Sequence, residues 1–113
     1  MKGNIYELQK LLDEFIEKRN WQKYHSPKNL SMAISIEASE LMEHFLWCEK
    51  NASEFSKEER EEIGEEMADV LHFLLRLSSV MDIDLYEASK KKIAKNEKRF
   101  KIEDANSIKK KGC

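Results

Sequence analysis

The stretch SPKNLSMAISIEASELMEHFLW, residues 26–47, decides the fold of this chain. Ser26 followed by Pro27 is typical of a helix N-cap and first helical position, where a proline sacrifices no hydrogen bond. At about 100° per residue, the segment from Pro27 to about Trp47 gathers its apolar side chains on one side. That face consists of Leu30, Ala33, Ile34, Leu41 and Phe45. We therefore predict an amphipathic helix that packs against the rest of the chain.

Three further helices are predicted around this one. They are capped by Asn4, Ser56 and Asp84 and run to about residues 19, 81 and 100. A glutamate stands three residues after each cap, at the spacing of a capping box. The segments 20–25 and 49–55 are expected as connections, and no segment alternates with period two. The predicted class is all-α, as a four-helix bundle-like protomer.

The length and composition fit a few long helices. With 113 residues, 41% of them apolar, 37% charged, three glycines and one proline, the chain is expected to form a single domain over 1–113. About 101–113 is expected to be a basic, flexible tail. A chain of this size buries only about two-thirds of its unfolded surface. A thin core is therefore expected, and pairing with a second copy would thicken it.

The charges are balanced overall but unevenly placed. The chain has 22 acidic and 20 basic residues and a net charge of −2, so no nucleic-acid partner is expected. Residues 37–69 are strongly acidic, while residues 90–111 carry ten lysines and arginines. Two distant cysteines, Cys48 and Cys113, predict no disulfide, and no apolar run is long enough to span a membrane. We expect a soluble, cytoplasmic protein without a membrane partner.

Carboxylates lie on or beside the apolar faces of two predicted helices. Glu37 lies near the centre of the apolar face of the predicted helix 27–47, and Glu40 lies roughly 60° to one side. Burial of a charge is costly unless it is paired or bound to a metal. On the next helix, Glu66 and Asp69 flank an apolar stripe. That stripe consists of Ile63, Met67, Val70, Leu74, Leu77 and Met81.

Two such pairs on adjacent antiparallel helices can converge on one point. Ligation by oxygen alone favours Mg²⁺, or Mn²⁺ in its place, over zinc. A single E-x-x-E on a helix is most often an exposed charged face. The metal hypothesis therefore depends on both pairs, Glu37 with Glu40 and Glu66 with Asp69, acting together.

Several segments, in order, resemble the MazG-like nucleotide pyrophosphohydrolases, particularly the compact all-α type related to dCTP pyrophosphatase. The matching segments are YHSPKNL (24–30), EASELME (37–43), FLW (45–47), EEMADVL (65–71) and KIAKNEKRF (92–100). The signature of that family is E-x-x-E, a variable spacer and E-x-x-D. Here 25 residues separate Glu40 from Glu66, and the resemblance covers about residues 5–100.

The resemblance implies an activity and an assembly. The activity is hydrolysis of a (deoxy)nucleoside triphosphate to the monophosphate and pyrophosphate, with Mg²⁺ held by the residues at Glu37, Glu40, Glu66 and Asp69. The assembly is a dimer or tetramer. Glu37 is our candidate general base, because an apolar setting raises the pKa of a carboxyl. Similarity to the family favours dCTP or a related pyrimidine nucleotide as substrate.

Groups for the triphosphate and the base can also be assigned. Lysines and their neighbours at spacings of three and four can form one polar stripe against phosphates, which the resemblance supports. These residues are Lys92, Lys95, Asn96 and Arg99, with Lys28 or Asn29 assisting. Aromatic rings stack on nucleobases, and the candidates for that role are Trp21, His25 and Trp47. Phe73 and Phe100 stand where some relatives carry tyrosine.

Three other functions compete with this interpretation. A ferritin-type metal bundle needs an E-x-x-H pair from each of two helices, but the chain offers only Asp69-x-x-His72. A dimeric dUTPase-like activity uses similar carboxylate chemistry. A non-catalytic helical interaction module could instead use the acidic stripe to bind a basic partner.

Overall fold

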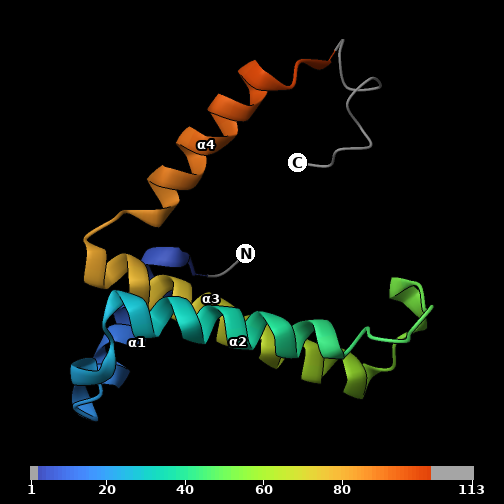
Figure 1. Cartoon of the computed structure of the whole chain (residues 1–113), viewed down its shortest axis with the longest axis horizontal. Coiled ribbons are helices and arrows are strands. Elements are labelled where there is room, and N and C mark those ends of the chain that lie inside the picture. The colour runs from blue at the N-terminus through green and yellow to red at the C-terminus, as the bar shows by residue number, and fades with distance from the viewer. Residues whose placement is uncertain (1–2, 103–113) are drawn as a thin grey trace. The chain divides into compact units, whose positions relative to one another are not determined.

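The computed structural model describes residues 3–102, and these residues are helical with no strand among them. Four α-helices follow one another, as Figure 1 shows. They are α1 (Ile5–Lys18), α2 (Pro27–Glu43), α3 (Lys57–Met81) and α4 (Leu85–Arg99). Two short 3₁₀ turns, Gln22–Tyr24 and Ala52–Glu54, lie in the predicted connections. The predicted all-α class with four helices is confirmed.

The predicted caps form because short polar side chains satisfy the free amides at helix starts. The side-chain oxygens of Asn4, Ser26, Ser56 and Asp84 each accept a hydrogen bond from the backbone N–H three residues later. At Ser56 the bond is reciprocal, since the Glu59 carboxylate accepts from the Ser56 backbone N–H. These caps fix where α2 and α3 begin, and so they set the register of the acidic residues along both helices.

The end of α2 differs from the prediction. The helix ends at Glu43 instead of continuing to about Trp47. Beyond it, the backbone N–H groups of Phe45 and Leu46 donate to carbonyls only three residues back, which tightens the chain into turns. Trp47 then adopts a left-handed backbone conformation, with φ of 61°. Local backbone turns therefore stop the helix although the apolar pattern continues.

The chain divides into two compact units, residues 1–83 and 84–113, each described by itself. In the first unit, α1 and α2 both pack on α3, and α2 runs beside α3 in the opposite direction (Figure 1). Ile16, Leu30 and Leu75 are the buried apolar side chains of the described chain, so the core is thin as predicted. The second unit holds α4. The predicted single domain stays a prediction, and most of the predicted tail, 103–113, lies outside the described residues.

The apolar stripe predicted for α3 is only partly covered. Met67, Leu74 and Met81 are exposed, whereas the most buried residues of α3 include Leu75 and Arg76. The predicted apolar face of α2 is better covered, with Leu30 fully buried. The face of α3 that packs inward therefore includes a charged side chain.

No helix in the described part of the chain is both long enough and apolar enough to cross a membrane. Cys48 forms no disulfide within the described part of the chain. Cys113 lies outside the described residues, so the predicted absence of a disulfide between the two stays a prediction.

Candidate metal centre

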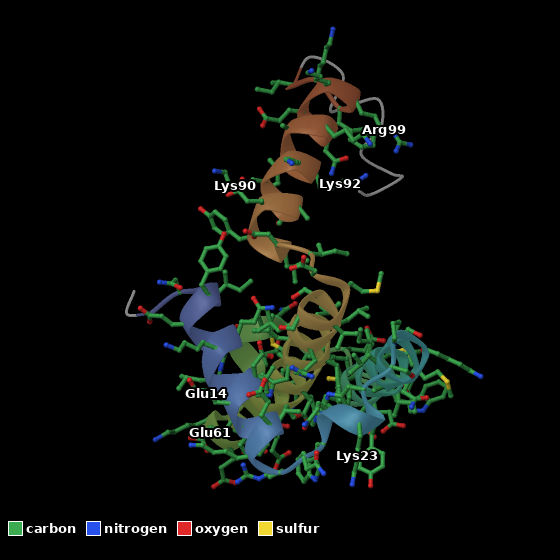
Figure 2. The ribbon with its side chains drawn as sticks, turned by 90° about the vertical axis from the view of Figure 1, so that its left-hand side faces the viewer. Glu14, Lys23, Glu61, Lys90, Lys92 and Arg99 are labelled. Atoms are coloured by element: carbon green, nitrogen blue, oxygen red, sulfur yellow. The ribbon has the colours of Figure 1, made fainter. Side chains whose placement is uncertain are left out.

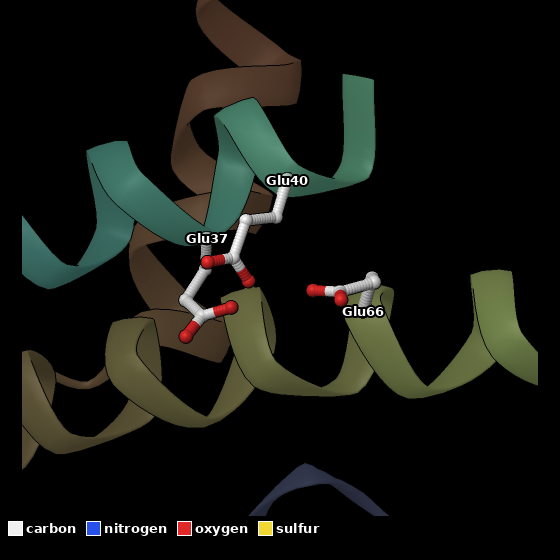
Figure 3. A group of neighbouring side chains, drawn as sticks. All are labelled: Glu37, Glu40 and Glu66. Carbon is white, nitrogen blue, oxygen red and sulfur yellow. The ribbon is translucent and has the colours of Figure 1, made fainter. Parts of the chain in front are cut away.

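Three of the four predicted carboxylates converge between α2 and α3. Glu37 and Glu40 are one helical turn apart on α2, and Glu66 faces them from α3, as Figure 3 shows. Each offers an oxygen that lies within 4.8 Å of an oxygen of the other two. No other acidic, histidine or cysteine group of the described residues is arranged in this way. The antiparallel packing of two helices thus brings distant sequence positions to one point.

Two oxygens in this cluster have no hydrogen-bond partner among residues 3–102. The Oε2 atoms of Glu37 and Glu66 are both buried and accept no hydrogen bond. Buried polar atoms are nearly always satisfied, so each such atom calls for an explanation. A divalent cation would satisfy both, because carboxylate oxygens are the ligands that Mg²⁺ and Mn²⁺ prefer. The donor set therefore fits a hard metal ion.

The electrostatics of the cluster disfavour three simultaneous negative charges. The pKa of Glu37 is raised to about 7, first by burial and then by a hydrogen bond shared with Glu40. The charges of Glu40, Asp69 and Glu66 contribute to the same rise. A bound cation would reverse this balance by stabilising the ionised carboxylates.

Asp69 lies near the cluster but outside the group of three. Its charge acts on Glu37, which places it in the same electrostatic environment. Its side chain is exposed and also lines a neighbouring pocket. His72, which completes the Asp69-x-x-His72 pair, is not part of the group either. The arrangement thus offers three convergent carboxylates, a fourth nearby, and no histidine ligand.

A pocket of about 340 Å³ lies beside Asp69 in the first unit. Trp21, His25 and Phe73 line it, together with apolar side chains of α1. The Trp21 ring meets the Phe15 ring edge to face, with 5.8 Å between their centroids. Two of the three predicted base-binding residues therefore share one cavity. Phe73 offers a flat ring there without a hydroxyl group.

Trp47, the third predicted base-binding residue, does not join this pocket. Its side chain is 94% exposed, beyond the end of α2. Its role in base binding stays a prediction.

A buried polar network next to the pocket was not predicted from the sequence. Arg76 is only 6% exposed and donates from Nη1 to Asp13 Oδ1 at 2.6 Å and from Nε to His25 Nδ1 at 3.1 Å. Ser79 also donates to Asp13. The sequence gives one indication of this network, which is an arginine inside the otherwise apolar run of residues 73–77. Its partners, however, lie 51 and 63 positions away in the sequence.

The predicted phosphate-binding residues fall in two places. Lys28 is exposed in the first turn of α2, while the Asn29 side chain donates to the Tyr24 carbonyl at 3.0 Å. Asn29 thereby ties the preceding turn to the helix, a local role that the sequence did not indicate.

The other four belong to α4 in the second unit, where Figure 2 labels Lys92 and Arg99. Lys92 and Lys95 line a hollow of about 600 Å³ with two further lysines of the same helix, Lys91 and Lys98. Asn96 is half-buried, and the Arg99 guanidinium lies 4.9 Å from the centroid of the neighbouring phenylalanine ring. One face of α4 is therefore cationic, and it includes Lys91 and Lys98 in addition to the predicted Lys92 and Lys95.

Comparison with known proteins gives consistent matches. The sequence model of the MazG-like family matches residues 32–113. The dCTP pyrophosphatase 1 of Rattus norvegicus is 32% identical over 101 residues, which cover 87% of this chain and 59% of that protein. That of Homo sapiens is 33% identical over 106 residues, which cover 91% and 62%. The chain thus spans less than two-thirds of the length of these curated relatives.

A solved structure resembles the chain as well. The crystal structure of a pyrophosphatase from Archaeoglobus fulgidus DSM 4304 is 43% identical in sequence and superposes with a TM-score of 0.78. The match covers 89% of this chain and 95% of that one.

Proposed function

This chain belongs to the MazG-like family, and we propose that it is a Mg²⁺-dependent nucleoside triphosphate pyrophosphohydrolase. It would hydrolyse its substrate to the nucleoside monophosphate and pyrophosphate. The observation that carries the proposal is the convergence of Glu37, Glu40 and Glu66, with two buried oxygens that lack a partner. A scaffold role alone gives no reason to gather these carboxylates.

The carboxylates have separate tasks in this proposal. Glu37, Glu40 and Glu66 would hold the ion, with Asp69 as the fourth predicted ligand. Bound Mg²⁺ supplies charge neutralisation at phosphate oxygens and lowers the pKa of an attacking water. Glu37 is the candidate general base: it sits in the apolar face of α2 and can receive a proton while Glu40 shares a hydrogen bond with it.

Other groups would hold the rest of the nucleotide. The pocket beside Asp69 offers Trp21 as a stacking surface and His25 as a polar contact for the base, with Trp47 as a further candidate. The triphosphate would be met by cationic and amide side chains, and the cationic ones form strong charge-assisted hydrogen bonds to phosphate. These are Lys92, Lys95, Asn96 and Arg99, with Lys28 or Asn29.

The proposed substrate is dCTP or a related pyrimidine nucleotide, and the proposed assembly is a homodimer or homotetramer. The substrate rests on the likeness to proteins named dCTP pyrophosphatase 1 and on the aromatic pocket. Assembly rests on the thin core and on exposed large apolar side chains. A dUTPase-like preference and a non-catalytic interaction module are the alternatives that the following experiment separates.

The test is a panel of common and modified (deoxy)nucleoside triphosphates incubated with Mg²⁺, with every product identified. Pyrophosphate and monophosphate in equal amounts are expected, with dCTP or a close analogue turned over fastest. Release of single phosphate would refute the proposed cleavage point, and preference for dUTP would favour the dUTPase-like alternative. No turnover of any nucleotide would favour an interaction module.

Glu40→Gln tests the metal site within the same assay. Removing one negative ligand should lower Mg²⁺-dependent pyrophosphate release by about a hundredfold or more, because several kcal/mol of charge stabilisation depend on the ion. Glu43→Gln is the matched control, since Glu43 is one turn further along α2, exposed and outside the cluster. Circular dichroism should show both variants folded. Full turnover by Glu40→Gln would refute the site.

A further inference from the structure

Arg76 is a charged side chain that the proposed chemistry leaves unexplained. It comes from α3, is 6% exposed, and forms an ion pair with Asp13 of α1. A buried ion pair contributes little net stability, because desolvation offsets most of its attraction. It does, however, fix the position of the guanidinium. The Ser79 hydroxyl lies 3.1 Å from Oδ1 and 3.0 Å from Oδ2 of Asp13, and its one donor, shared between them, holds Asp13 in turn.

The fixed guanidinium determines where the proton of His25 lies. Arginine carries only donors, so the 3.1 Å bond from Arg76 Nε requires His25 Nδ1 to be the acceptor. A neutral imidazole that accepts at one nitrogen carries its proton on the other, here Nε2. Burial, and after it the positive charge of Arg76, lower the pKa of His25, which keeps the ring neutral.

The ring held in this way lines the pocket beside the carboxylates. His25 and Arg76 supply polar surface to the cavity of about 340 Å³, as do Asp69 and His72, and Trp21 and Phe73 supply aromatic surface. Pockets that bind small molecules combine apolar walls with a few oriented polar groups that fix the ligand. A nucleobase that enters this cavity therefore meets a ring whose protonation is already set.

We propose that Arg76 is a positioning residue that holds His25 in its Nε2–H form, so that His25 offers an imidazole donor to a hydrogen-bond acceptor of the nucleobase. The inference rests on the proposed function, since it takes this pocket as the base site. The ligand class is a base with a ring carbonyl oxygen or an unprotonated ring nitrogen. Cytosine has both. Asp13 acts one step further away, by orienting Arg76.

The protonation state can be observed without any turnover. Two-dimensional ¹H–¹⁵N NMR of the imidazole rings at neutral pH should show a bare Nδ1 and a protonated Nε2 for the ring of His25, which is assigned by its loss in His25→Gln. In Arg76→Lys, which keeps a positive charge for Asp13, that ring should become a mixture of both neutral forms. A proton on Nδ1 in the wild-type protein would overturn the proposal.

The affinity for a nucleoside monophosphate tests whether Arg76 affects recognition of the base. Affinity for dCMP should fall about tenfold in Arg76→Lys, because one hydrogen bond to the base is no longer oriented. Affinity for 2-deoxyribose 5-phosphate, which lacks the base, should not change. In a His25→Gln background the same substitution should have no further effect on dCMP binding. Arg60→Lys is the matched control, because Arg60 is exposed on the same helix and its guanidinium donates to the Ala52 carbonyl.

The outcomes separate this inference from the proposed function. Equal losses for dCMP and for the sugar phosphate would show a purely structural role and overturn it. A wild-type protein that binds neither compound would refute the base site and the proposed function, while the NMR result would still decide whether Arg76 fixes the ring. If Arg76→Lys does not fold, Asp13→Asn combined with Arg76→Gln removes both charges together, and the same measurements apply.

Discussion

Glu37 holds a proton more tightly than an ordinary glutamate does, and this predicts how the metal-free protein responds to pH. Its pKa is raised to about 7, first by burial, whereas in the unfolded chain it returns to about 4.5. The folded state therefore keeps the proton on Glu37 up to a higher pH than the unfolded chain does. The resulting stability is complete below about pH 4.5 and is lost as the pH rises through about 7.

The melting temperature of the protein in a metal chelator should thus fall between about pH 4.5 and pH 7, as followed by circular dichroism. Mg²⁺ added at the upper pH should restore it, because the ion stabilises the ionised carboxylates. Glu37→Gln cannot ionise, so its melting temperature should depend less on pH. An equal pH dependence in the variant and the wild type would show that another group is responsible.

Single residues were predictable where a local rule was broken. Glu37 was assigned because a carboxylate on an apolar helix face has few explanations, and it lies in the cluster. Asp69 was a flank residue on the wheel and lies outside the group of three. The bond between Arg76 and Asp13 spans 63 positions, so no local spacing could indicate it. Pairings between helices depend on packing, which one sequence does not display.

At the scale of elements, helix starts were predicted better than helix ends. A cap needs only two residues that lie three positions apart, and all four proposed caps form. The end of α2 had no such signal, because the apolar pattern continues through Phe45. The chain nevertheless turns after Glu43, and Trp47 lies in a left-handed conformation. Pattern alone therefore overestimated the helix.

That conformation of Trp47 predicts an unusual response to substitution. A left-handed backbone costs a residue with a side chain about 1 kcal/mol, and glycine avoids this cost. Because the side chain is 94% exposed, little packing is lost. Trp47→Gly should therefore raise the free energy of unfolding by about 1 kcal/mol in urea titrations. A contribution of the ring to base binding would appear separately, as a raised KM.

Trp47→Ala separates the two effects. It removes the same ring but keeps a side chain at the left-handed position, so it should raise KM equally and give no gain in stability. A loss of stability in both variants would contradict the prediction, since it would mean that the ring is buried in solution.

At the scale of the whole molecule, the sequence predicted the class of the fold and the thinness of its core. Length alone limits burial, and three apolar side chains are buried among the described residues. The division into two units was not predicted, because no glycine or proline marks the boundary between Ile83 and Asp84. The apolar stripe on α3 suggested a covered face, yet several of its residues are exposed. Excess apolar surface in a single chain indicates a partner surface.

The N-terminal helix offers the clearest place to test self-association. Leu8 and Leu11 of α1 border two apolar hollows, of about 490 and 250 Å³, and Leu11 is 64% exposed. Burial of such surface against a second copy would contribute about 25 cal/mol per Å² before the cost of association. Sedimentation equilibrium should therefore give a mass of two or four times 13.4 kDa.

Leu11→Lys should shift this equilibrium toward the single chain, because a charge buried at an interface without a partner is costly. Lys10→Gln is the matched control: the neighbouring position is exposed and polar, so the mass should not change. A wild-type protein that sediments as one chain at tens of micromolar would contradict the proposed assembly. If Leu11→Lys kept the wild-type mass with a normal melting curve, the assembly would have to use another face, and the exposed side chains of α3 would be the next to substitute.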